Sequence, residues 1–161
     1  MIKLGSIVKD TASGLTGMLT HLQVEMNGNR YMLFQPHGLN PQTGQPVKVM
    51  WGVETRFQGG ERVEEPKLPL EVLGTEVEDL ASGFKGIATG CCLHITGCVH
   101  ITVQPQGKLT ETGGAVDPVE FDMRRLAGPA IKAMSEKARE RDQQRKPSPG
   151  RVTRYQPLPP R

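Results

Sequence analysis

The chain has 161 residues, of which 36% are hydrophobic and 4% aromatic, and it contains 19 Gly and 13 Pro. This composition argues against a helical bundle or a large single-core enzyme and favours small, turn-rich β domains. The formal net charge of +3 hides an asymmetry, because residues 127–161 hold nine Lys/Arg against three Asp/Glu. That balance of +6 leaves −3 for residues 1–126, so we expect a mildly acidic body and a basic C-terminal segment.

A repeat divides the chain into two copies. Residues 4–36 align without gaps with residues 73–105 at an offset of 69, and twelve positions are identical. Chance does not produce this agreement, so the sequence indicates a tandem duplication of one small domain. We expect copy one at 1–57, a linker at 58–72 and copy two at 73–126. The identical pairs are Leu4/Leu73, Gly5/Gly74, Val8/Val77, Asp10/Asp79, Ala12/Ala81, Ser13/Ser82, Gly14/Gly83, Gly17/Gly86, Thr20/Thr89, Gly28/Gly97, Gln35/Gln104 and Pro36/Pro105.

Copy one has the pattern of short β-strands separated by turns. Asn27-Gly28 is typical of a two-residue hairpin loop, and Pro36 ends the returning strand because it cannot donate to a ladder. Five short strands in about 55 residues favour a small, strongly bent barrel of the SH3-like type. The predicted segments are, in chain order, 7–10, 17–26, 30–35, 47–53 and 54–57.

Copy two repeats this order. Its central hairpin is expected to turn at Thr96-Gly97, which would pair Ile95 with Cys98 and Leu93 with His100. The fold class predicted is therefore mainly β, with two tandem SH3-like (KOW-like) barrels. The linker, rich in acids and prolines, is expected to resist compact folding. Domains this small are near the lower limit for independent folding, so the copies are expected to pack on each other or on a partner.

Glycines at shared positions are predicted to serve turns and bends, where the chain needs positive φ or a close approach between strands. A phosphate-binding loop would need a helix after the glycines, whereas here a strand follows, so phosphate binding is not expected. The predicted structural turn glycines are Gly14, Gly17, Gly28, Gly83, Gly86 and Gly97.

The segment after copy two is predicted to be helical and then extended. Gly128-Pro129 opens a helix expected over 127–146, because Pro suits the first helical position. Residues 147–161, called the arm below, are too rich in Pro and Arg to form a core. We expect them to be polyproline-like and ordered only on a neighbour. The candidate partner-binding residues are Ile131, Met134, Arg151, Arg154, Tyr155 and Leu158.

Three cysteines and two histidines between residues 91 and 100 raise the question of a metal site. The expected hairpin places Cys91, Cys98 and His100 on one face, and Cys92 and His94 on the other. Zinc needs four converging ligands, and no four share a face, so no metal is expected. The odd cysteine count and the absence of an apolar signal segment favour reduced thiols in a cytosol. Whether Cys91, Cys92 or Cys98 is redox-active stays open.

The remaining chemistry argues against catalysis. The four histidines lie at positions that the other copy fills with other residue types, and no serine or carboxylate pair is set beside them as a catalytic group. We therefore expect no enzymatic activity, no catalytic residue and no cofactor. No apolar run is long enough to span a bilayer, so no membrane partner is expected. The basic C-terminal segment could attract nucleic acid, but the acidic copies and scarce aromatic residues weigh against that partner.

The pattern Leu-Gly-x-x-Val-x-Asp-x-x-Ser-Gly-x-x-Gly, at 4–17 and 73–86, resembles the KOW/SH3-like barrel signature. It is also similar to small proteins encoded among the structural genes of tailed bacteriophages. Copy two matches best, through Ser82-Gly83-Phe84-Lys85-Gly86-Ile87-Ala88-Thr89, whereas copy one departs at Leu15, Met18 and Leu19. The resemblance covers about two-thirds of the chain and implies a virion component without catalysis.

Together these observations predict a bacteriophage virion structural protein, made in the host cytoplasm. A capsid decoration or minor capsid protein is the first expectation, with the copies and the arm binding other virion proteins in a homo-oligomer or symmetric array. A component of the neck, collar or tail is the first alternative. A KOW-type nucleic-acid-binding module is the second.

Overall fold

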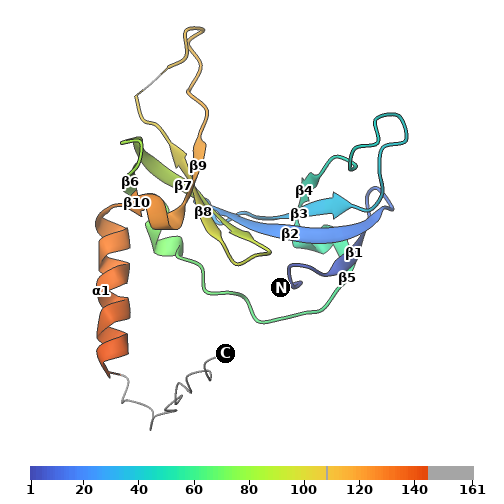
Figure 1. Ribbon diagram of the computed structural model, residues 1–161, viewed down its shortest axis with the longest axis horizontal. Coiled ribbons are helices and arrows are strands. Elements are labelled where there is room, and N and C mark those ends of the chain that lie inside the picture. Colours follow the sequence, from blue (N-terminus) through green and yellow to red (C-terminus); the bar gives the residue numbers. More distant parts are fainter. Residues whose placement is uncertain (108, 145–161) are drawn as a thin grey trace, which may run out of the picture.

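The computed structural model of the protein describes residues 1–107 and 109–144 (Figure 1). In this part the chain is mainly β, as predicted: the strands are joined by antiparallel pairings, and one helix lies near the C-terminal end. Among the described residues, no helix is both long enough and apolar enough to cross a bilayer.

The two copies form the same elements in the same order. The bounds of the first two strands and of the short 3-10 helix recur at the offset of 69 residues, so the repeat extends to the structure. Copy one consists of β1 (Ile7–Asp10), β2 (Thr16–Glu25), β3 (Arg30–Pro36), β4 (Met50–Gly52), η1 (Glu54–Arg56) and β5 (Phe57–Gly59). After η2 (Leu70–Val72), copy two consists of β6 (Glu76–Asp79), β7 (Lys85–His94), β8 (Val99–Gln104), β9 (Val119–Asp122), η3 (Met123–Arg125) and β10 (Leu126–Ala127), and α1 (Pro129–Gln144) follows.

The copies share one sheet through β2 and β7. The first residues of β2 pair with β1 of the same copy, whereas His21–Glu25 pair with the last residues of β7. β3 and β8 lie along the other edges of these two strands and pair in turn with β4 and β9. A continuous antiparallel sheet therefore runs through both copies in the order β4–β3–β2–β7–β8–β9 (Figure 1).

Two hydrophobic cores lie against one face of this shared sheet. Leu22 and Val24 of β2 belong to the first core, and Cys91, which pairs with Val24, belongs to the second. Because side chains alternate along a strand, the residues between them point to the opposite face. The buried residues of the first core are Ile2, Val8, Leu19, Leu22, Val24, Met32, Phe34 and Phe57; those of the second are Val72, Val77, Ala88, Cys91, Ile101, Val103 and Leu126.

The linker is packed, which differs from the expectation that it resists compact folding. Its residues Leu68 and Leu70 contact both cores, and Val72 is fully buried in the second. Further back, Arg62 forms a β-bridge with Ile2. Burial of the apolar residues between the acids and prolines stabilises the linker more than the prolines and charges disfavour an ordered structure. The linker therefore runs along the lower side of the shared sheet (Figure 1).

Both central hairpins turn through three residues, so the predicted two-residue loops were wrong. The N–H of His94 donates to the carbonyl of Cys98 over 2.9 Å, and that of Glu25 to Asn29 over 2.9 Å. In copy two the loop is Ile95–Gly97, and the register shifts so that Cys92 lies opposite His100. The third residue of each loop, Gly28 or Gly97, adopts positive φ, which is the usual geometry of a three-residue hairpin loop.

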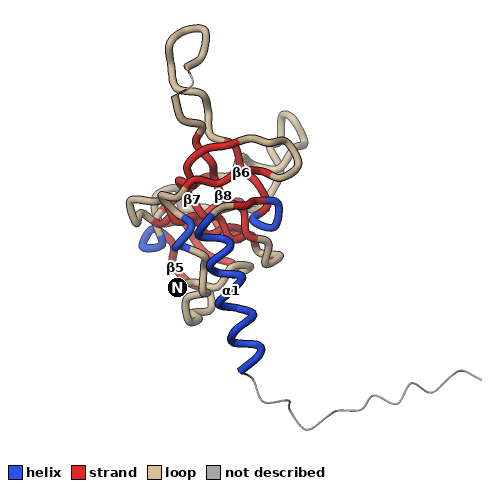
Figure 2. Tube along the Cα trace, turned by 90° about the vertical axis from the view of Figure 1, so that its left-hand side faces the viewer, coloured by secondary structure: helices blue, strands red, loops and turns tan. Residues whose placement is uncertain are grey.

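The helix α1 begins at Pro129, as the Gly128-Pro129 signal predicts, which is two residues after the start of the predicted range 127–146; residues 145 and 146 lie outside the described part of the chain. Ala130, Ile131 and Met134 are partly buried against the second core. The rest of α1 runs away from the sheets (Figure 2). The arm, with Arg151, Arg154, Tyr155 and Leu158, lies outside the described residues.

Candidate functional site

The shared Asp of the repeat motif is buried in an ion pair. Asp10 is fully buried, and it accepts hydrogen bonds from Arg56 Nε (2.5 Å) and Nη2 (2.8 Å), and from the Ser13 hydroxyl (2.5 Å). The Arg56 guanidinium holds the pKa of Asp10 well below its usual range, although burial alone would raise it. The hydrogen bonds from Ser13 and Ala12 also lower this pKa. These contacts fasten the turn after β1 to the 3-10 helix η1.

Copy two repeats this arrangement. Asp79 is fully buried and accepts from Arg125 Nε (3.0 Å) and Nη2 (2.7 Å), and from the Ser82 hydroxyl (2.6 Å). The hydrogen bond from Ser82, followed by that from Arg125, lowers the pKa of Asp79 although burial opposes it. Sequence reasoning missed both arginines, yet Arg56 and Arg125 also lie 69 residues apart, just beyond the aligned segments. The polar residues of the motif are therefore engaged in holding the fold.

The turn glycines divide into two kinds. Gly17 and Gly86 permit close strand contact, because a Cβ there would lie 2.2 Å from the carbonyl oxygen of Gln35 and 2.3 Å from that of Gln104, respectively. A side chain at either position would push β2 from β3, or β7 from β8. The other four adopt the left-handed conformation that favours glycine: Gly14, Gly28, Gly83 and Gly97.

The face of the shared sheet that points away from the cores carries polar and aromatic residues. We call it the open face, defined by the alternating residues of β2 and β7 (His21, Gln23, Glu25, Gly90, Cys92, His94) and their neighbours on the outer strands (Tyr31, Leu33, Trp51, His100, Thr102, Glu120, Asp122). Strand pairing brings residues from both copies onto this surface, which neither copy would form alone.

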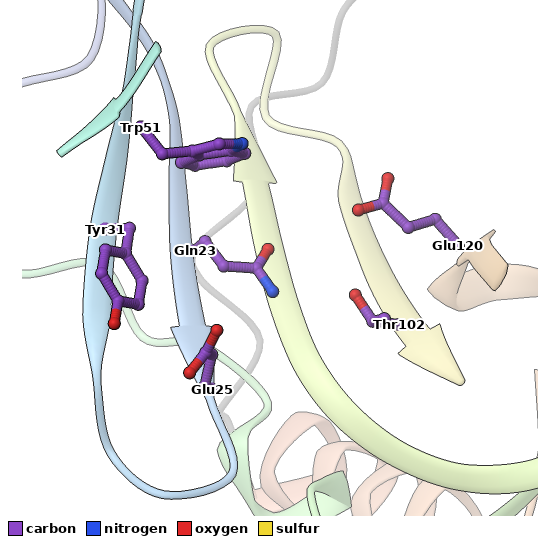
Figure 3. Close-up of a pocket in the computed structure, with 6 residues that line it drawn as sticks. All are labelled: Gln23, Glu25, Tyr31, Trp51, Thr102 and Glu120. Carbon is purple, nitrogen blue, oxygen red and sulfur yellow. The ribbon is translucent and has the colours of Figure 1, made fainter. Parts of the chain in front are cut away.

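A cleft of about 370 Å³ lies on the open face (Figure 3). Tyr31 and Trp51 line it from copy one, Thr102 and Glu120 line it from copy two, and residues of β2 lie between them. A second hollow of about 330 Å³ shares Gln23, Glu25 and Thr102 with it, so the two form one groove. We call the first hollow the cleft; it is lined by Gln23, Glu25, Tyr31, Trp51, Thr102 and Glu120.

Gly90 shapes the floor of this groove. A Cβ there would lie 2.4 Å from Nε2 of Gln23 and 3.1 Å from Oγ1 of Thr102, so both side chains occupy space that any other residue would take. Gln23 Oε1 and Thr102 Oγ1 are buried and find no hydrogen-bond partner within the described residues. Buried polar atoms without a partner are costly, and these two lie where a ligand with a polar backbone could pair with them.

The cleft combines an exposed aromatic ring with negative charge. Trp51 is 45% exposed, so much of its indole ring is open to contact with a ligand. Glu25 and Glu120 form no ion pair with the side chains of residues 1–107 and 109–136. The arrangement suits a ligand that offers positive charge and flat apolar surface.

Histidines occupy the adjoining part of the open face. The rings of His21 and His94 meet edge to face with centroids 4.4 Å apart, and His21 also lies 6.3 Å from the Trp51 ring. Burial, followed by the nearby His94 and His100, lowers the pKa of His21. The corrected hairpin register brings Cys92 and His100 to this face together, yet in the described part of the chain no three such side chains are placed to hold a metal ion.

The cysteines differ in exposure. Cys91 and Cys92 are buried free thiols, and burial raises their pKa values to about 11 and about 12, with Glu120 adding to the effect on Cys92. Thiols in this state are protonated near neutral pH and react poorly. Cys98 is partly exposed.

Of the predicted partner-binding residues, Ile131 and Met134 lie against the second core, on the side of the sheet opposite the cleft. Sequence reasoning did not find the cleft, because its residues come from five strands of two copies. Comparison of the chain with protein-family models, curated proteins and solved structures gave no match.

Proposed function

We propose that the protein is a non-enzymatic structural protein of a tailed bacteriophage virion, most simply a capsid decoration or minor capsid protein. The observation that carries its role as a binding protein is the open face, where both copies together build a cleft around an exposed tryptophan. The assignment to a virion rests on the sequence resemblance. Binding of other virion proteins through this face and through the arm is the function proposed.

The architecture of each copy supports this proposal. Copy one runs β5–β1–β2–β3–β4 with a 3-10 helix before its last strand, and copy two runs β10–β6–β7–β8–β9 with the equivalent helix. This is the order expected of an SH3-like barrel, and we propose that each copy is one. Small barrels of this kind are binding scaffolds whose specificity comes from loops and surface grooves.

The surroundings of the open face also suit a protein partner. The long loops 37–49 and 109–118 project on the same side of the molecule, away from the linker (Figure 1). They carry Leu39 and Leu109, which are both largely exposed. Together with the exposed tryptophan of the cleft, these two leucines offer apolar surface to a protein partner.

The two alternatives differ in what they require. A neck, collar or tail component would use the same open face at a position of lower copy number. A KOW-type nucleic-acid module would need a surface that attracts phosphate, whereas Glu25 and Glu120 make the cleft acidic. Steep weakening of RNA or DNA binding with added salt would favour that module and contradict the proposal.

Quantitative mass spectrometry of purified virions tests the proposal. Hundreds of copies per particle would place the protein in the shell, about six or twelve would place it in the neck or tail, and absence from virions would contradict a structural role. Trp51→Ala should reduce incorporation of the protein into particles. Ile7→Ala is the matched control, because Ile7 is equally exposed but lies on β1, outside the cleft.

A further inference from the structure

We propose that the cleft binds the arm of a second copy of this chain, through the segment Arg154-Tyr155-Gln156-Pro157-Leu158-Pro159-Pro160-Arg161. This inference rests on the proposed function, because it names the partner of the same cleft. It would make the chain both the donor and the acceptor of one intersubunit contact.

The sequence of the segment fits an aromatic, acidic groove. Arg154, Pro157 and Pro160 follow one another at intervals of three residues, and Arg161 ends the segment. A polyproline II helix has three residues per turn, so residues at this spacing lie along one edge of it. Proline-rich segments are largely pre-ordered in this conformation and dock into grooves lined by aromatic residues at a low entropic cost.

The cleft offers complementary groups for each part of such a segment. The rings of Tyr31 and Trp51 provide flat surface for the proline edge, and both line the same hollow. Glu25 of β2 and Glu120 of β9 face each other across the cleft, and their carboxylates would form ion pairs with the arginines of the arm. A polyproline II backbone has no internal hydrogen bonds, and Gln23 Oε1 and Thr102 Oγ1 are buried without a partner in the described residues.

Charge complementarity supports the pairing further. Residues 147–161 contain three arginines and no acidic residue, whereas residues 1–126 carry a net charge of −3. The cleft itself is lined by two carboxylates and by no basic side chain. Association of the arm with this surface is therefore favoured before any close contact forms.

The position of α1 favours a second copy over the same chain. The helix packs against the second core, on the face of the shared sheet opposite the cleft, and then runs away from the sheets (Figure 2). An arm that continues from Gln144 therefore starts on the wrong side of its own sheet. The 17 residues after Gln144 would span about 50 Å if extended as polyproline II, which is enough to reach a neighbouring molecule.

Trp51 gives a direct assay, because it is the only tryptophan of the chain. We expect its emission in the full-length protein to shift to shorter wavelength as the protein concentration rises, together with an increase in mass measured by light scattering. A synthetic peptide of residues 145–161 should compete and return the protein to monomers.

Charge reversals test the contact itself. Arg154→Glu and Glu120→Arg should each weaken self-association by about tenfold or more, and the two together should restore part of it. Lys146→Glu and Glu76→Arg are the matched controls, because the first precedes the arm and the second is an exposed residue of β6 outside the cleft. Circular dichroism of each variant shows whether it is folded.

Three results would overturn the inference. The first is an emission independent of protein concentration with no response to the peptide. The second is a Trp51 emission that indicates shielding at every protein concentration and exposure only in Arg154→Glu. That result would mean that the arm occupies the cleft of its own chain. The third is loss of particle incorporation in Trp51→Ala but not in Arg154→Glu. In that case the proposed function would stand and another partner would fill the cleft.

Discussion

Gln23 pairs directly across the shared sheet with Cys92, which is its own counterpart in copy two. Residues that pair with their own counterparts lie on a two-fold axis, so the two copies are related by an approximate two-fold rotation through this pair. The same rotation exchanges Trp51 with Glu120, and His94 with Glu25. The backbone of the open face is therefore close to symmetric, whereas its chemistry is not.

Removal of one partner from a buried ion pair should destabilise the protein strongly. Arg56→Met leaves Asp10 buried without its cation, and we expect a loss of about 3–5 kcal/mol in the free energy of unfolding. Arg124→Met is the control, because this side chain is 82% exposed and solvent screens its pair with Asp122, so its loss should change the stability little. Urea unfolding followed by circular dichroism measures both, and equal effects of the two variants would contradict the assignment.

Acid should destabilise the protein through the same residues. The pKa values of Asp10 and Asp79 are lowered in the folded state, so the unfolded chain binds more protons as the pH falls below about 4. Stability from these groups is complete above that pH and is lost progressively below it. Unfolding midpoints measured between pH 6 and pH 2 should fall less steeply in Asp10→Asn than in the native chain. An unchanged slope would show that Asp10 contributes no stability of this kind.

The close strand approach at Gly86 predicts a steric effect. A Cβ there meets the backbone of Gln104, which cannot move without separating β7 from β8, so Gly86→Ala should destabilise copy two by about 1–3 kcal/mol. Gly114→Ala is the control, because a Cβ at Gly114 has only one neighbour within 4 Å, Thr110 Oγ1 at 3.4 Å. Thermal unfolding compares them, and a Gly86 variant as stable as the control would contradict the contact.

The thiols should differ in reactivity. Burial raises the pKa values of Cys91 and Cys92 to about 11 and about 12, so alkylation of the native protein at pH 8 should modify Cys98 first. The other two should react only after denaturation. Peptide mapping by mass spectrometry identifies the modified residue, and early modification of Cys92 would show that the shared sheet opens readily.

The repeat made much of the fold predictable from the sequence. Shared residues such as Gly17 and Gly86 located the strands of both copies, and Gly128-Pro129 located the start of α1. The hairpin register was not predictable from Thr96-Gly97 alone, because two-residue and three-residue loops both use a glycine there. An error of one residue in the loop moves every later side chain to the other face of the sheet. The predicted hairpin therefore placed Cys92 and His100 on opposite faces.

The cleft was beyond sequence reasoning for a different reason. It depends on the pairing of β2 with β7, and the sequence of neither strand indicates that its edge pairs with a strand of the other copy. Trp51 was visible as an isolated aromatic residue, but its relation to Glu120 follows only from the sheet that joins them. Contacts between distant segments of this kind are fixed by the whole fold.

Gly90 stands where His21 stands in copy one, and Glu120 stands where Trp51 stands, so the two-fold rotation does not map the residues of the cleft onto residues of the same kind. Under the contact proposed between arm and cleft, each subunit gives one arm and receives one, so every contact joins a donor to an acceptor. Subunits linked in this way can exchange arms as a closed pair, close into a larger ring or grow as an open filament. The chemical asymmetry inside the chain therefore gives the proposed contact a direction, and the rotation between successive subunits decides which of these assemblies forms.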